Sequence, residues 1–437
     1  MRFSLVRWGV LAATLSTPLA LADEADAGVA APTAAVAQAA DAGVPTAAVP
    51  DVPWFELFRI YGTVKPTIIW SDTGVESFGR SNATATTAAG NPVMAALVDQ
   101  SRLTFQAAQT RFGFWVNEKG AYRGQLEFDF LDFGKASATT GANPRVRIAT
   151  AQWVPSDKFA LIVGQDWDLY APVNPHGSNL VGARFESGNS GFMRQQVKAI
   201  GRVGDFELGG AVGLAGNSNA ERDGPLELGA IPTFALRGAW VVNKASRVGI
   251  SALITQIRFT PGTATSRNAL AGAMAAHADL TFAQTNVRGE VYLARNGANL
   301  GMLTLGQGYA GADVDEWGGF VSLRQGITAM HFIYANAGYA HVLNPSKVKP
   351  AYSYASLPSD GSPPAASGAA LALANGPGIL TNVGGVLGYE LRLSKNWAFM
   401  LEGFFFATHF ALTDFDAARF PENRATFGAE LCAMLNF

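Results

Sequence analysis

The feature of this sequence that most constrains its fold is a series of segments in which apolar and polar residues alternate. Leu126 and Phe128, for example, alternate with Glu127 and Asp129. A period of two is typical of a β-strand whose two faces meet different surroundings. One such segment suits a soluble β-sandwich as well as a membrane barrel, so the connectors between segments must decide.

The connectors alternate strictly between long and short. We predict sixteen strands, at about 57–69, 101–115, 120–133, 144–154, 159–167, 191–203, 205–215, 231–242, 247–259, 276–284, 286–295, 316–325, 328–341, 379–393, 397–409 and 424–437. Connectors after odd-numbered strands are long, and those after even-numbered strands are tight turns. Bacterial outer-membrane barrels have an even number of antiparallel strands, short periplasmic turns and long extracellular loops. The sequence therefore predicts an all-β transmembrane antiparallel barrel over residues 54–437.

Composition agrees with a barrel and argues against other classes. Charged residues make up 15 % of the chain, against about 25 % in soluble domains. No segment beyond the N-terminal region approaches the ~18 consecutive apolar residues of a membrane-spanning helix. The 34 acidic residues outnumber the 32 basic ones, which argues against a nucleic-acid partner.

The N-terminus predicts export. Arg2 and Arg7 form a positive region, residues 8–15 are apolar, and a small-x-small motif ends at Ala22. This order is typical of a secretory signal peptide. We expect residues 1–22 to be cleaved after Ala22 on the way to the bacterial outer membrane.

A short Ala- and Pro-rich pattern repeats over residues 23–53, which contain no aromatic residue. Such a segment has no apolar face to bury and should remain extended. We interpret it as a periplasmic linker; a solvated tail without a role fits equally well.

The last predicted strand carries a second sorting feature. Leu431, Ala433, Leu435 and Phe437 share one face of it. A terminal Phe on an amphipathic strand resembles the assembly signal that the barrel-assembly machinery of Gram-negative bacteria recognises. We therefore expect Phe437 to act as that signal.

Metal and cofactor chemistry is not expected. The single cysteine, Cys432, points inward by strand parity, and the five histidines show no metal-ligand spacing. We expect no metal site and no cofactor.

Four segments resemble a known family. They are "FRIYGTVKPTIIW", "SRLTFQAAQTRFGFWVNEKGAYRGQLEFDF", "RVRIATAQW" and "FALIVGQDWDLYAP", which together fall within residues 58–172. They resemble the DcaP-like trimeric outer-membrane porins and, more broadly, the sixteen-stranded diffusion porins. The resemblance implies a homotrimer in outer-membrane lipid and lipopolysaccharide. It also implies passive diffusion of small hydrophilic solutes, often dicarboxylates and other anions.

The same resemblance implies that the third long loop, residues 168–190, folds into the lumen and narrows it. This loop contains Asp168 and Glu186, and Asp166 comes just before it. We expect these acidic residues to line the constriction.

Basic residues occupy the predicted lumen positions of the neighbouring strands. They are Arg59, Arg102, Arg123, Arg145 and Arg147 on strands one to four, and Arg194, Lys198 and Arg202 on strand six. A basic wall facing an acidic loop would set up a transverse field and a mild preference for anions. The alternative is that these residues are solvated lining, or are paired with Glu127 and Asp129. The alternation fails at Gln109, Arg111 and Gln165, because these polar residues fall on the apolar faces of their predicted strands. A bulge or the trimer interface is the explanation.

Two other functions stay open for the same fold. A plugged structural or adhesive surface barrel would keep the barrel and use the 342–378 loop at the surface. An outer-membrane barrel enzyme of the esterase or lipase type would need a Ser-His pair, and the sequence has no G-x-S-x-G motif. We therefore do not expect an enzyme.

Overall fold

The computed structural model describes residues 57–73, 101–130, 144–178, 187–191, 193–214, 232–259, 267–297, 312–348, 378–411 and 422–437, with four two-residue strands inside 74–100. The predicted signal peptide and linker lie outside these residues. Among the described residues, no helix has the length and hydropathy needed to cross a bilayer.

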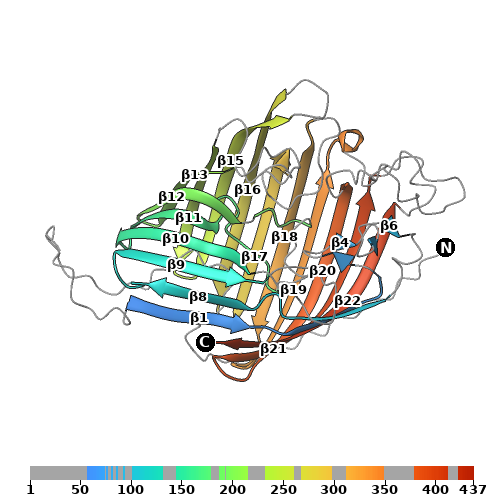
Figure 1. The fold of residues 1–437 in the computed structure, drawn as a ribbon, viewed down its shortest axis with the longest axis horizontal. Coiled ribbons are helices and arrows are strands. Elements are labelled where there is room, and N and C mark those ends of the chain that lie inside the picture. The colour runs from blue at the N-terminus through green and yellow to red at the C-terminus, as the bar shows by residue number, and fades with distance from the viewer. Residues whose placement is uncertain are drawn as a thin grey trace, which may run out of the picture.

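One antiparallel sheet contains almost all of the described structure (Figure 1). Its strands are β1 (Phe58–Val64), β2 (Thr67–Ser71), β7 (Arg102–Gln106), β8 (Arg111–Val116), β9 (Tyr122–Asp129), β10 (Arg145–Ser156), β11 (Phe159–Trp167), β12 (Met193–Val203), β13 (Phe206–Gly213), β14 (Thr233–Asn243), β15 (Ser246–Phe259), β16 (Arg267–Phe282), β17 (Thr285–Arg295), β18 (Asp315–Gly326), β19 (His331–Val342), β20 (Ile379–Arg392), β21 (Trp397–Phe410) and β22 (Asn423–Asn436). The short strands β3 (Val75–Glu76), β4 (Arg80–Ser81), β5 (Ala85–Thr86) and β6 (Pro92–Val93) form two hairpins in the first long connector.

The sheet closes into a barrel of sixteen spanning strands, because two of these strands are interrupted. β1 and β2 are halves of one strand broken at 65–66, and β7 and β8 are halves of the next, broken at 107–110. The last strand pairs with the first, with Thr63 opposite Asn436 and Thr67 opposite Cys432. The predicted fold class and strand number are confirmed.

The ring of Phe437 covers the seam where the barrel closes. Its backbone exchanges two hydrogen bonds of 3.1 Å with Gly62, and its ring centroid lies 5.9 Å from that of Phe112. A Cβ on Gly62 would lie 2.6 Å from the Phe437 ring. The glycine therefore makes room for the aromatic ring on the outer face.

The two faces of the sheet differ as a membrane barrel requires. Ile60 and Leu236 on the outer face are 72 % and 68 % exposed, whereas Thr426, Glu402 and Glu430 on the inner face are fully buried. An apolar outer face and a polar inner face are the arrangement of transmembrane barrels.

One strand boundary was wrong by a wide margin. The strand predicted at 276–284 begins at Arg267. Its inner face is a row of alanines, Ala269, Ala271, Ala273 and Ala275. Alanine contrasts weakly with the apolar outer residues, so the period of two is hard to detect there.

The parity failure around Arg111 is explained by the break between β7 and β8. Phe105 and Phe112 both face outward and are 56 % and 45 % exposed, although seven positions separate them in the sequence. A turn, in which the Thr110 amide donates to the Ala107 carbonyl over 2.9 Å, changes the parity. Arg111 consequently points into the barrel.

A bulge explains the outward Gln165. The register of β10 against β9 shifts between Val146 and Ile148. Gln165 Nε2 donates to the Val146 carbonyl over 2.6 Å and to the Arg147 carbonyl over 3.2 Å. The side-chain amide of Gln165 thus donates hydrogen bonds to two carbonyls that the bulge removes from the regular ladder of inter-strand hydrogen bonds.

Candidate functional site: the barrel lumen

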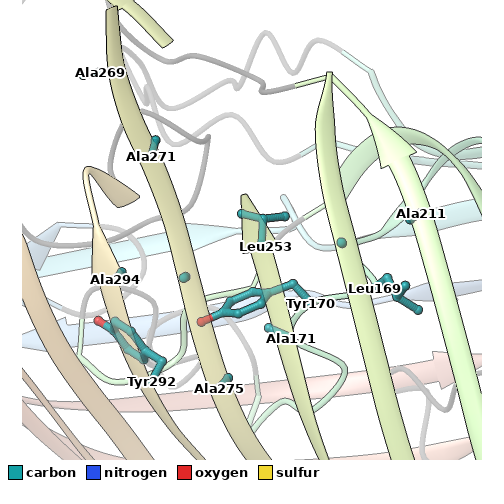
Figure 2. Packing of buried hydrophobic residues seen from close by; sticks show 12 residues of the cluster. Leu169, Tyr170, Ala171, Ala211, Leu253, Ala269, Ala271, Ala275, Tyr292 and Ala294 are labelled. Carbon is teal, nitrogen blue, oxygen red and sulfur yellow. The ribbon is translucent and has the colours of Figure 1, made fainter. Parts of the chain in front are cut away.

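The described parts of the third long loop, residues 168–178 and 187–190, lie against the inner face of the barrel, and apolar contacts hold the first of them. Leu169 and Tyr170 are 1 % and 0 % exposed and pack on small and apolar residues of β13–β17. Figure 2 shows them lying against the wall between Ala211 and Tyr292. Burial raises the pKa of the Tyr170 phenol above its usual range, so the group remains a neutral donor. The alanine row of β16 therefore makes room for the loop, since larger side chains would occupy the same space.

Hydrogen bonds continue the attachment along the wall. Ser251 Oγ on β15 donates to the Tyr170 carbonyl over 2.5 Å. The His176 amide donates to Ser322 Oγ on β18 over 2.8 Å, and Asn336 Nδ2 on β19 donates to the His176 carbonyl over 2.6 Å. The loop thus follows the inner face from β15 to β19.

Ser178 is fixed by two carboxylates. Glu402 on β21 and Glu430 on β22 face each other across the ladder, and both are fully buried. Ser178 Oγ donates to Glu402 Oε2 over 3.0 Å and also contacts Glu430, while the Ser178 amide donates to Glu402. Tyr334 OH donates to Glu402 over 2.6 Å. Lys65, at the break between β1 and β2, donates to the Ser178 carbonyl.

The returning part of the loop is attached to the same wall. The Ser190 amide and hydroxyl donate to Glu290 on β17 over 3.2 and 2.7 Å. Gly188 has a φ of +114°, and a Cβ there would lie 2.1 Å from the Gly319 carbonyl oxygen. The backbone of the loop therefore lies directly on β18.

These contacts divide the inner wall. The described loop residues contact β12, β15, β17, β18, β19, β21, β22 and the break between β1 and β2, and they pack on β13, β14 and β16. The contacts leave a wall made by β1 and β7–β10, which carries most of the sequence-predicted basic residues.

An arginine cluster lies on this wall. Arg111, Asp129 and Arg145 are directly opposite one another on three neighbouring strands. Arg145 donates to Asp129 over 2.9 and 2.7 Å, and Arg147 is paired with Glu127. Three arginines and two carboxylates leave a formal charge of about +1 in this cluster.

Arg111 is the member of the arginine cluster that the sequence pattern placed on the apolar outer face. Its Nε atom is buried and has no hydrogen-bond partner among the described residues. The only signal in the sequence was the polar run from Gln109 to Arg111 inside an otherwise alternating strand. Such a run predicts an interruption of the strand, but it does not predict which residues face inward after the interruption.

The remaining basic residues on this wall lie nearer the barrel ends or pair locally. Arg123 donates to Gln152 over 2.9 Å and lies over the Trp115 ring at 5.8 Å. Arg59 pairs with Glu118 of the first tight turn over 2.5 Å. Arg102 lies opposite Ser71 and is exposed.

Of the predicted acidic residues, Asp166 and Asp168 do not face the basic ones across the lumen. Asp168 pairs with Arg194 over 2.7 Å, and Asp166, which belongs to β11, pairs with Lys198 over 2.7 Å. Both pairs are lateral contacts on one wall, because β11 and β12 are neighbours. Glu186 lies outside the described residues. Within the described part of the chain no group of three metal-ligating side chains occurs.

Solved structures share the fold of this chain. No family model matches the sequence, and no curated protein matches it. The outer-membrane channel DcaP of Acinetobacter baumannii superposes with a TM-score of 0.59 at 12 % identity, over 87 % of this chain and 97 % of that one. This chain has the porin fold.

Two more porin-fold structures match at lower similarity. OmpF of Salmonella typhi, in complex with daunomycin, gives a TM-score of 0.50 at 12 % identity, over 87 % of this chain and 97 % of that one. The trimer form of OmpT, an outer-membrane protein of Vibrio cholerae, gives 0.50 at 11 % identity, over 87 % and 99 %. At these identities the similarity establishes the fold, and the porin fold that the DcaP-like segments predicted is confirmed. Function must be argued from the lumen.

Proposed function

We propose that this chain is an outer-membrane porin for passive diffusion of small hydrophilic solutes, with a preference for anions such as dicarboxylates. The observation that carries the proposal is the division of the inner wall. The loop occupies the side of β13–β22, and the arginine cluster of Arg111, Arg145 and Arg147 lies on the wall that the loop contacts leave.

The chemistry of this cluster suits anions. Ring charges at a narrow point set ion preference, because ions lose part of their hydration there. Arg111 adds a third guanidinium to a cluster with two carboxylates, so an anion in the lumen would balance the excess positive charge. Guanidinium groups bind carboxylates with two parallel hydrogen bonds.

The test is conductance in a planar bilayer. The protein, purified in detergent, should give stepwise conductance, and its reversal potential in a salt gradient should show anion preference. Dicarboxylates should reduce the chloride current more than neutral sugars of similar size. A folded barrel without conductance would instead support a plugged structural or adhesive barrel, because the loop would then fill the lumen.

Two parts of the proposal concern assembly and location. We propose a homotrimer, supported by the trimer form of OmpT among the similar structures, and native mass spectrometry tests it. We also propose that Ala22 is the last residue of a cleaved signal peptide; N-terminal sequencing of protein from outer membranes tests both cleavage and location.

A further inference from the structure

One row of polar residues crosses the outer face of the barrel at the rim next to the long connectors. It consists of Trp317 on β18, His341 on β19, Thr381 on β20, His409 on β21 and Asn423 on β22. Each residue is directly opposite the next in register. We call these five residues the rim row.

The rim row faces outward and marks the upper edge of the apolar belt. The residues that alternate with it, such as Val342, Asn382 and Thr408, are buried on the inner face. Towards the tight turns the same strands present apolar side chains such as Leu387 and Leu401, which are 70 % and 53 % exposed. Polar groups at this height meet lipid headgroups, because the hydrocarbon layer ends where the apolar belt ends.

The His341 ring of the rim row is oriented by its neighbours. His341 Nδ1 lies 2.8 Å from Thr381 Oγ1, and the His341 ring stacks on Tyr339 at 6.2 Å. Tyr339 in turn lies 5.2 Å from Trp317. The aromatic contacts and the Thr381 contact fix the ring, so its other nitrogen, Nε2, is left as the group for an outside partner.

Two acidic groups near the rim row are engaged elsewhere, and a third, Glu422, is exposed next to Asn423. Asp315, two positions before Trp317, accepts from Arg295 over 2.6 and 2.9 Å. Asp72, beyond β22, accepts from the Phe427 amide over 2.8 Å. His341 and His409 are the basic members of the rim row.

The outer face over β7–β13 differs from the side that carries the rim row. The outward positions of β7–β13 carry no His, Arg, Lys, Asp or Glu in the described residues. One other outward histidine, His331, lies on β19 at the opposite rim, near the tight turns, where its Nδ1 is 2.5 Å from Tyr389 OH.

We propose that the rim row binds the phosphorylated headgroup of an outer-leaflet lipid. Neighbouring strands are about 4.8 Å apart, so His341 and His409 are about 10 Å apart with Thr381 between them. Imidazole N–H groups, a hydroxyl and an amide are donors that suit phosphate oxygens. This inference rests on the proposed location in the outer membrane.

The test compares lipopolysaccharide binding by the purified full-length trimer, measured by native mass spectrometry in detergent. The variants are His341→Ala/His409→Ala and, as matched control, His331→Ala. The wild type should retain phosphorylated lipopolysaccharide and lose it after phosphatase treatment of the lipid. The double variant should bind at least about tenfold more weakly, because loss of even one of its two hydrogen bonds to a charged group has about that effect, and the control should bind as the wild type does.

A competition experiment and a milder variant complete the test. Inorganic phosphate at millimolar concentration should compete weakly, because the lipid chains contribute to binding. The single variant His409→Ala, which leaves the His341–Thr381 contact intact, provides a milder change if the double variant folds poorly. Equal binding by wild type and double variant, or an equal loss in His331→Ala, would overturn the proposal. Bilayer conductance of the same samples is a separate readout, so failure of the pore function is distinguishable from failure of the lipid site.

Discussion

Phe437 lies with its ring over Gly62, and the two residues exchange both backbone hydrogen bonds where the barrel closes. The seam thus combines a regular ladder with an aromatic ring that needs a glycine beneath it. The same ring contacts Phe112 on β8, so Phe437 joins three strands on the outer face. This contact gives the predicted assembly signal a structural role that can be examined on its own.

Gly62→Leu should impair closure of the barrel. Its side chain would meet the Phe437 ring and the Arg111 carbonyl, since even a Cβ would lie 2.6 and 2.5 Å from them. We expect a smaller fraction of folded, heat-modifiable protein in refolding assays and a loss of stability of about 1–3 kcal/mol. Gly403→Leu is the control, because a Cβ there meets nothing within 4 Å. Equal folding of both variants would show that the seam does not depend on the glycine.

Phe437→Ala tests the ring itself. We expect slower folding into heat-modifiable barrels and a loss of about 1–3 kcal/mol of barrel stability, because the contacts with Phe112 and Gly62 disappear. Phe399→Ala, another outward aromatic on β21 that is 38 % exposed, is the matched control. If both variants assemble at the same rate, Phe437 has no special part in assembly.

Much of the barrel could be predicted from the sequence because its signals are local. Alternation and connector length gave sixteen strands, and the structure has sixteen spanning strands. Weak contrast hid the first part of β16, where Ala269 and Ala271 alternate with Leu270 and Gly272. The pattern indicates a strand only where the two faces differ in polarity.

The lumen was less predictable, because its arrangement depends on irregular backbone. One turn at 107–110 reverses the parity of a strand and brings Arg111 inside. Lateral pairs such as Arg194 with Asp168 depend on which strands are neighbours and on side-chain reach. Attachment of Ser178 to Glu402 involves residues far apart in sequence, for which no local pattern exists.

Arg111→Gln should reduce anion preference without closing the pore. The substitution removes the positive charge that the two carboxylates of the cluster do not balance. We expect the anion-to-cation permeability ratio, from reversal potentials in a salt gradient, to fall by about twofold. Lys395→Gln makes the same charge change in an exposed periplasmic turn and should leave the ratio unchanged. A ratio unaffected by Arg111→Gln would remove this residue from the ion path.

Ser178→Ala should loosen the attachment of the third loop to β21 and β22. It removes the hydroxyl that bonds both Glu402 and Glu430 and leaves two buried carboxylates with one donor fewer, at a cost of about 1–3 kcal/mol. We expect more frequent conductance fluctuations in single-channel records and faster proteolysis within the loop. Ser156→Ala, at the exposed end of β10, is the control. Recordings as quiet as those of the wild type would mean that the apolar contacts of Leu169 and Tyr170 suffice to hold the loop.

Gly188→Ala separates loop position from barrel stability. The residue has a φ of +114°, where an L side chain is strained by about 1–3 kcal/mol, and its Cβ would meet the Gly319 carbonyl oxygen. The strands do not depend on this residue for pairing, so we expect unchanged heat-modifiability of the folded barrel. The loop, in contrast, should move away from β18 towards the arginine cluster, which narrows the path and lowers single-channel conductance. Gly201→Ala, where a Cβ meets nothing within 4 Å, should leave conductance as it is. An unchanged conductance in Gly188→Ala would place the ion path away from the loop and count against the proposed pore.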